Sequence, residues 1–185
     1  IGSATGITTF TGGAGNDTIT GGSAADVITG GAGGDIINVG TGVGADKVVI
    51  SAAGQTAEWT DQTASTTIAT TGMDIITGLN AGDDIALAMY TVTAATSAAD
   101  GVFDSDSITY AADLSVAVAA NSAKFVRGDY SSNTFTESAT GADVLMAFDA
   151  DLDETDVDYE ALILIGLGEN TFSLDAGVGG IISIA

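Results

Sequence analysis

The sequence contains no cysteine, no proline and no histidine among its 185 residues. Without cysteine the chain forms no disulfides, so a fold in an oxidising extracellular setting would need another kind of cross-link. The absence of proline fits continuous ladders of paired strands, because proline cannot donate a backbone hydrogen bond. The absence of histidine and cysteine removes the ligands that zinc and copper prefer.

Basic residues are also scarce, with three Lys and Arg against 25 Asp and Glu and a formal net charge of −22. No basic patch exists to neutralise phosphates, which argues against nucleic acid and disfavours anionic membranes. Self-repulsion should oppose compaction unless cations bind. A spanning helix is not expected, because no run of about 18 apolar residues occurs. Since no signal segment is found at Ile1, we expect a mature fragment or domain.

Three consecutive nine-residue units run from residue 12 to residue 38: GGAGNDTIT, GGSAADVIT and GGAGGDIIN. Glycines at positions one, two and four favour a turn whose carbonyls point inward. The β-branched and apolar residues that follow predict a six-residue turn and a three-residue strand. The alternative is a flexible linker, but a linker would not require aspartate and isoleucine at the same positions of each nine-residue unit. Each unit has aspartate at position six and isoleucine at position eight: Asp17, Asp26 and Asp35, with Ile19, Ile28 and Ile37.

Every second turn of such a chain should lie on the same side. Asp17 is therefore expected near Asp35, and Asp26 near Asp46, with an ion between successive same-side turns. Asp46 belongs to a fourth unit, TGVGADKVV from Thr41, which follows a two-residue insertion at Val39 and Gly40. Carboxylates and backbone carbonyls suit calcium, which takes six to eight oxygen ligands. The pattern predicts calcium binding.

A polar stretch from Ser51 to Thr71 is interpreted as an excursion from these repeats. From Met73 to Tyr90, two apolar runs flank a Gly-Asp-Asp turn, which predicts strand, turn and strand. Three acidic residues at the strand ends could close a last metal site, or could be solvated acids of a surface turn: Asp74, Asp83 and Asp84.

The C-terminal half is expected to be rich in β structure from Lys124 onward. Ala111 to Ala123 fits a short helix or an alternating strand, and its alanine content favours the helix. Acidic residues from Asp149 to Glu160 have EF-hand spacing, but Glu154 stands where the loop needs glycine. A solvated acidic hairpin loop is favoured there, with some other calcium contact as the alternative.

The nonapeptides match GGxGxDxUx and resemble the RTX (repeats-in-toxin) calcium-binding proteins that bacteria export by type I secretion. The match is specific over residues 12 to 38 and extends to residue 49. The segment DIITGLNAGDDIAL looks like the one that commonly follows RTX rolls. The remainder, with FVRGDY and YEALILIG, is similar to the β-rich ends of secreted surface-layer and adhesin proteins.

This resemblance implies an all-β fold: a calcium-binding parallel β-roll over 1–50, an excursion with roll-closing strands over 51–90, and a β-rich region over 91–185 that ends in the export signal. It implies several calcium ions, with Asp17, Asp26, Asp35 and Asp46 as side-chain ligands. The implied backbone ligands are the carbonyls of Gly13, Gly15, Gly22, Ala24, Gly31, Gly33, Gly42 and Gly44.

The leading hypothesis for function is a structural domain of a secreted, extracellular surface protein, such as a subunit of an S-layer or filament. Calcium would fold it and bridge acidic subunits into a homo-oligomer or lattice. An enzyme is not expected, because the chain lacks histidine, an HExxH motif and a GxSxG elbow. The alternatives are an adhesin or toxin-like module that binds a glycan or host receptor, and the non-catalytic domain of a secreted enzyme.

Overall fold

The computed structural model describes residues 8–50, 58–60, 67–87, 123–148, 158–170, 172–175 and 180–185. The described residues form strands and turns, with no helix among them. No helix in that part of the chain is therefore long and apolar enough to cross a membrane. The predicted all-β fold is confirmed.

A six-stranded sheet, called sheet A here, contains every second strand of the repeats. Its first four strands run parallel, the fifth pairs antiparallel with the fourth, and the sixth pairs antiparallel with the fifth. In spatial order the strands are β1 (Thr8–Ala14), β3 (Asp26–Ala32), β5 (Lys47–Ile50), β9 (Asp84–Leu87), β15 (Ile181–Ile184) and β14 (Phe172–Asp175).

A nine-stranded sheet, sheet B, contains the alternate strands of the repeats and most of the C-terminal region. Its first four strands are parallel and the others antiparallel. In spatial order they are β2 (Thr18–Thr20), β4 (Ile36–Asn38), β8 (Asp74–Thr77), β13 (Asp158–Leu164), β12 (Asp143–Phe148), β10 (Ala123–Ser131), β11 (Thr134–Glu137) and β7 (Thr67–Ala69), and β6 (Glu58–Thr60) pairs with β13.

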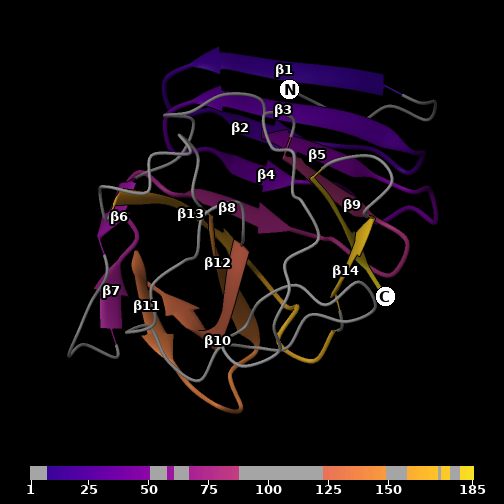
Figure 1. Ribbon diagram of the computed structural model, residues 1–185. Helices are drawn as coiled ribbons and strands as arrows, with labels where there is room; N and C mark the ends of the chain where they lie inside the picture. The colour runs from indigo at the N-terminus through magenta and orange to yellow at the C-terminus, as the bar shows by residue number, and fades with distance from the viewer. Residues whose placement is uncertain are drawn as a thin grey trace.

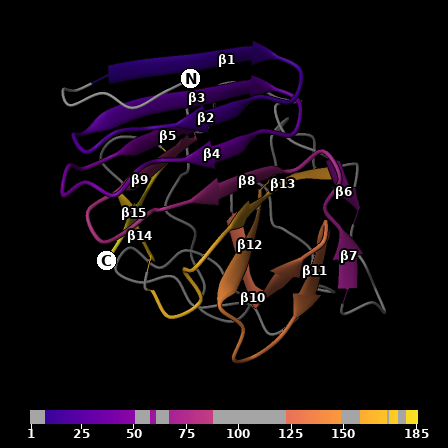
Figure 2. The same ribbon diagram turned by 180° about the vertical axis from the view of Figure 1, so that it is seen from behind.

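The chain passes alternately from one sheet to the other and so builds a parallel β-roll, whose strands stack one above another in Figures 1 and 2. The isoleucine at position eight of each unit is fully buried between the sheets. Its neighbours in β2, Thr18 and Thr20, are exposed. Alternation with a period of two thus places one apolar side chain per strand in the core.

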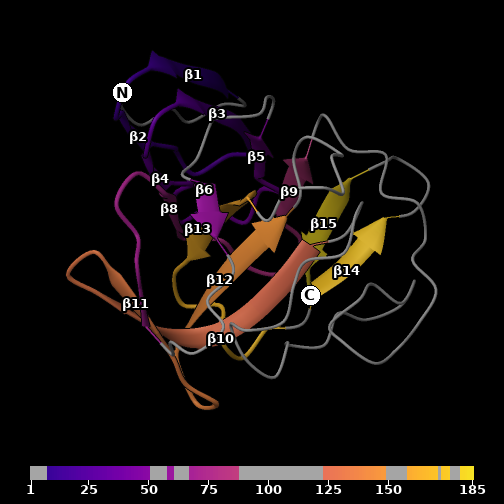
Figure 3. The same ribbon diagram turned by 60° about the vertical axis from the view of Figure 1, so that its left-hand side comes forward.

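The C-terminal strands extend both sheets of the roll. Figure 3 shows β15 and β14 following β9, and β13, β12 and β10 following β8. Phe125, Met146 and Leu162 from these strands belong to the same buried cluster as Ile37 and Ile76 of the roll. The three regions expected from the sequence therefore share one core, and the boundaries between them remain a prediction.

Some predictions lie outside the described residues. They include most of the excursion over 51–71, the helix expected over 111–123 except Ala123, which begins β10 instead, and residues 149–157 of the acidic segment from Asp149 to Glu160. The ends of that loop are described: Phe148 of β12 pairs with Glu160 of β13 in antiparallel register. This pairing fits the favoured hairpin.

Candidate metal centre

The turns of the roll form two columns, one along each edge of the stack (Figures 1 and 2). Turns that lead into sheet B carry Asp17, Asp35 and Asp74, which we call the first ladder. Turns that lead into sheet A carry Asp26, Asp46 and Asp83, the second ladder. Aspartates far apart in the sequence are thereby brought into register.

Each ladder is joined by hydrogen bonds from backbone to carboxylate. In the first ladder, the Asp17 amide donates to Asp35 Oδ1 and the Asp35 amide donates to Asp74 Oδ1, both at 2.8 Å. In the second, Asp26 donates to Asp46 Oδ1 and Asp46 to Asp83 Oδ1, again at 2.8 Å. The predicted stacking of Asp17 near Asp35 and of Asp26 near Asp46 is confirmed.

The second oxygen of the carboxylate lies over the first glycine of its own turn. A Cβ on Gly30 would come 2.1 Å from Asp35 Oδ2, and one on Gly12 would come 2.6 Å from Asp17 Oδ2. Any larger residue at position one would therefore displace the carboxylate. The glycines at this position create the space in which the aspartate folds back over the turn.

The fourth unit begins earlier than the sequence predicted. Gly40, rather than Gly42, packs on Gly22: a Cβ on Gly40 would lie 2.0 Å from the Gly22 carbonyl oxygen, and its φ is +117°. The two extra residues therefore lie inside the turn, where Val43 is fully exposed. Because Gly40 stacks on Gly22, we expect the backbone carbonyl at position two of this unit to be that of Gly40 instead of Gly42.

Two further units continue the roll, and the sequence interpretation did not recognise them as repeats. Residues 69–77 and 78–86 keep aspartate at position six and isoleucine at position eight, namely Asp74 with Ile76 and Asp83 with Ile85. Both isoleucines are fully buried. The isoleucine two residues after each aspartate was the signal available in the sequence. Few of the glycines expected at positions one, two and four are present in these two units.

Asp84, the third acid predicted to close the last site, lies outside both ladders. It is the first residue of β9, where its Oδ1 accepts a 2.6 Å hydrogen bond from the Ser183 hydroxyl. Its other oxygen lies 4.0 Å from Lys47 Nζ. The structure therefore links Asp84 to the C-terminal strand β15.

Burial makes three of the ladder carboxylates, those of Asp35, Asp46 and Asp74, costly to ionise. It raises the pKa of Asp35 and Asp46 above the usual value, against the effect of the amides that donate to them. Asp74 is shifted furthest: burial, with smaller contributions from the charges of Asp35 and Glu160, raises its pKa to about 7. A bound cation would offset all of these penalties.

The oxygens present fit calcium. Asp35 Oδ2 is buried and has no hydrogen-bond partner in the described part of the chain. Within the same part, no three acidic side chains converge as a metal-binding group. An ion between two turns would thus take few carboxylates and complete its shell with backbone carbonyls and water, which calcium readily does.

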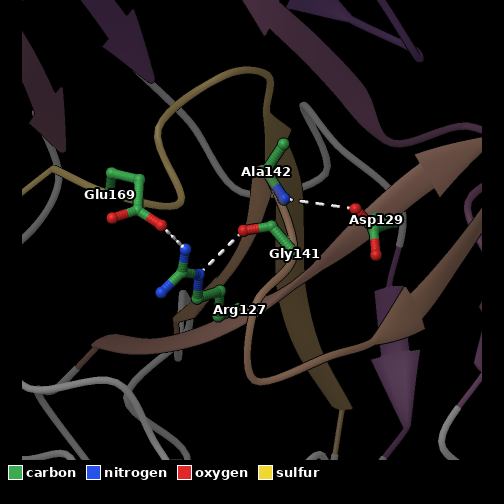
Figure 4. Close-up of polar contacts among 5 residues, drawn as sticks. All are labelled: Arg127, Asp129, Gly141, Ala142 and Glu169. Atoms are coloured by element: carbon green, nitrogen blue, oxygen red, sulfur yellow. Dashed lines mark hydrogen bonds and ion pairs between the residues drawn. The ribbon is translucent and has the colours of Figure 1, made fainter.

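The contacts drawn in Figure 4 belong to a different part of the molecule. The Arg127 Nε donates to the Gly141 carbonyl at 2.7 Å and its guanidinium binds Glu169, while Asp129 accepts from the Ala142 amide. These contacts tie β10 to the loops before β12 and after β13. Their role is to hold the C-terminal strands together.

Comparison with known proteins agrees with this geometry. Residues 4–46 match the family model of the RTX calcium-binding nonapeptide repeat, in four copies. The match begins within residues 3–11, where Phe10 stands at position eight and Thr8 replaces the aspartate. No curated protein matches the chain. The protein therefore carries RTX calcium-binding repeats, and calcium binding is the function of this part of the chain.

Proposed function

We propose that this chain is a structural domain of a secreted bacterial surface protein, which folds and self-assembles when it binds extracellular calcium. The observation that supports this proposal best is the pair of aspartate ladders inside a chain of net charge −22. Without cations, such ladders concentrate buried negative charge along both edges of the roll.

The residues that would hold calcium are Asp17, Asp26, Asp35, Asp46 and Asp74, with carbonyls of the glycine-rich turns. Bound calcium supplies positive charge that neutralises the carboxylates. Each site filled at about 100 times its dissociation constant adds roughly 2.7 kcal/mol to folding. Several such sites are enough to decide whether a domain of this size is folded.

Extracellular location and type I secretion follow from the resemblance to RTX proteins. Millimolar calcium outside the cell would fill sites that remain empty in the cytoplasm, so the chain would leave unfolded and fold outside. The absence of cysteine makes this folding independent of disulfide oxidation.

Self-assembly is supported by the charge of the molecule. Two strongly acidic copies can touch only when the repulsion between them is screened or bridged, and a divalent cation does both. Among the described strands, β1 lies at one end of sheet A, and it has six neutral polar or small residues and Phe10 but no charge. Edge strands without charge or proline readily pair with other chains.

A module that binds a glycan or host receptor is the second candidate, and the non-catalytic domain of a secreted enzyme is the third. Catalysis by this chain itself is not proposed, because the sequence has no histidine and none of the hydrolase motifs considered above. Oligomeric state separates the first two candidates: a lattice subunit grows into large particles in calcium, whereas an adhesive module stays monodisperse.

The test is a calcium titration of chelator-treated protein, followed by far-UV circular dichroism and light scattering, with magnesium as the control. We expect a cooperative gain of β structure that is specific to calcium, followed by growth of large particles. A spectrum that does not change between chelator and calcium would overturn calcium-dependent folding. Calcium-dependent folding to a stable monomer would overturn self-assembly alone.

A further inference from the structure

Strand β1 is the longest of the described strands that pair with one other strand only. It has seven residues, whereas the others of this kind, β2, β6, β7 and β14, have three or four. A short strand at the edge of a sheet offers few backbone groups to another chain, and charged side chains on such a strand have the same protective effect. β1 has neither protection, because it also lacks a charged residue.

The backbone of β1 is held in place by the roll. β1 pairs in parallel with β3 from Thr8, opposite Asp26, to Ala14, opposite Ala32. The Thr8 amide also donates to Asp26 Oδ1 at 3.1 Å, which joins β1 to the second ladder. The edge of β1 that faces away from β3 pairs with no described strand. Folding of the roll therefore presents this edge in a fixed, extended form.

The opposite end of the roll is covered by strands of the C-terminal region. In sheet A, β15 pairs with β9, the last of the parallel strands. In sheet B, β13 pairs with β8, the last strand of the repeats. Figure 3 shows these strands continuing both sheets. Among the described strands, the end at β1 is therefore the one at which the repeats of the roll offer a long edge.

Two copies of the chain can join these edges by a two-fold axis perpendicular to sheet A. The axis sets the two β1 strands antiparallel in one continuous sheet and leaves the two copies of sheet B in one layer. Because β1 has no charge, every antiparallel register of β1 with itself avoids placing acids opposite each other. In a chain of net charge −22, such a strand lets two copies meet without opposed carboxylates.

We propose that a second copy of this chain docks on β1, so that two molecules join head to head through antiparallel pairing of β1 with β1. Calcium controls the contact by folding the roll that presents β1, and no ion is needed between the paired strands. The inference rests on the calcium-dependent folding and self-assembly proposed above, and it names the surface where assembly begins.

The experiment compares variants of Thr11, an exposed residue of β1, by sedimentation velocity at a calcium concentration that just completes folding. Thr11→Lys and Thr11→Glu each bring like charges together across the axis, which should raise the dissociation constant of the dimer about tenfold or more. An equal mixture of the two variants should restore dimers, because opposite charges then meet. Restoration by mixing is a result that a folding defect would not give.

Thr41→Lys is the matched control. Thr41 is also an exposed threonine, but it lies in the turn before β5, away from the edge of β1. The substitution adds the same charge and should leave dimerisation close to that of the unmodified protein. Circular dichroism in calcium checks that each variant folds.

A second readout uses the absence of cysteine from the chain. Pyrene attached to Thr11→Cys should show excimer emission in calcium, because the two labels lie close together across the axis. Pyrene attached to Thr41→Cys should show none in the dimer. Hydrogen exchange of the amides from Thr9 to Ala14 should slow as the protein concentration rises.

The outcomes separate this inference from the proposed function. If calcium does not fold the unmodified protein, the proposed function fails. If the protein folds and assembles, but Thr11→Lys and Thr41→Lys assemble alike and the label on Thr11→Cys gives no excimer, this inference alone is wrong. A monomer in calcium would overturn both self-assembly and this contact. Protected β1 amides in such a monomer would assign the edge to another segment of the same chain.

Discussion

Asp46 donates its backbone amide to Asp83 Oδ1 at 2.8 Å, although 37 residues separate the two along the chain. The same bond joins Asp26 to Asp46 across 20 residues. The carboxylate therefore makes the same contact whether the connection between turns is short or long. An aspartate at position six therefore has a structural role in addition to any role in binding an ion.

Replacing Asp46 by asparagine should separate this structural role from metal binding. The amide oxygen of Asn can still accept from Asp26, so the ladder should persist, while the negative charge is lost. We expect the calcium concentration at the folding midpoint to rise roughly tenfold or more, because ligand charge sets affinity in calcium sites. Circular dichroism during a calcium titration measures this midpoint.

Asp84→Asn is the matched control, since Asp84 begins β9 outside both ladders. It removes the same charge and keeps an oxygen for the Ser183 hydroxyl. Its calcium midpoint should stay close to that of the unmodified protein. Equal shifts in both variants would mean that overall charge, rather than ligand position, governs the response.

Gly31 and Gly13 form a second matched pair. Both have positive φ, +117° and +130°, but a Cβ on Gly31 would lie 1.9 Å from the Gly13 carbonyl oxygen, whereas one on Gly13 would meet no atom of the described residues within 4 Å. Gly13→Ala should cost only backbone strain, about 1–3 kcal/mol. Gly31→Ala should cost about 1–3 kcal/mol more through the clash.

Denaturant unfolding in excess calcium measures both free energies. The difference between the two variants is the informative quantity, because backbone strain is common to them. Equal destabilisation would show that neighbouring turns can move apart, contrary to the close stacking described here.

The raised pKa of Asp74 predicts how pH affects the calcium-free protein. An aspartate whose folded pKa, about 7, exceeds its ordinary value of 3.8 binds its proton more tightly when folded. Its contribution to stability is fully present below pH 3.8 and is lost as pH rises through about 7. Asp35 and Asp46 shift in the same direction.

Wherever the calcium-free chain is folded, calcium should therefore displace a proton from Asp74 at pH 6 and almost none at pH 8, since the carboxyl of the folded chain is largely ionised at the higher value. Calorimetry at each pH in two buffers of different ionisation enthalpy counts the protons released. Asp74→Asn should abolish the difference between the two pH values. Identical proton release by this variant would assign the effect to another group.

Asp143 tests the C-terminal strands independently of calcium. Its Oδ2 accepts the Tyr130 amide at 2.8 Å and its Oδ1 accepts the Gly166 amide at 2.9 Å. Asp143→Ala leaves both amides without this acceptor and should cost about 2–4 kcal/mol. Asp143→Asn, which keeps one oxygen, should cost about half as much.

Thermal unfolding with calcium and with chelator measures this cost, wherever the chain is folded in both. We expect a similar loss in the two conditions, because Asp143 lies outside both ladders. A loss confined to the calcium-loaded protein would instead connect Asp143 to the metal sites.

The sequence predicted what depends on short-range periodicity. A unit of nine residues places Ile19, Ile28 and Ile37 in the core and stacks Asp17 with Asp35, and the structure has both. Both VGTG and TGVG have glycine at positions two and four, but only a unit that starts at Thr41 places Asp46 at position six, so the sequence favoured Thr41, whereas stacking on Gly22 selects Gly40. The pattern within a single unit could not show which glycine packs against the neighbouring turn.

Long-range pairing could not be predicted from the sequence. Nothing in YEALILIG indicates that β13 pairs in parallel with β8, or that Leu162 lies opposite Asp74 in this register. Likewise, Asp83 and Asp84 are adjacent in sequence but make different contacts. Because successive side chains of a strand point to opposite faces, Asp83 accepts the Asp46 amide in the ladder and Asp84 accepts the Ser183 hydroxyl. These contacts depend on packing across the whole core.

The stacking of the roll also has a mechanical consequence. Among the described strands, β1 pairs with β3 alone and β2 with β4 alone. Aspartates of successive coils on one edge, such as Asp17 and Asp35, are 18 residues apart. A force that pulls on the outermost strand would therefore peel the domain one coil at a time, instead of shearing whole sheets. Such a domain would lengthen in steps under tension and rewind coil by coil when the tension falls.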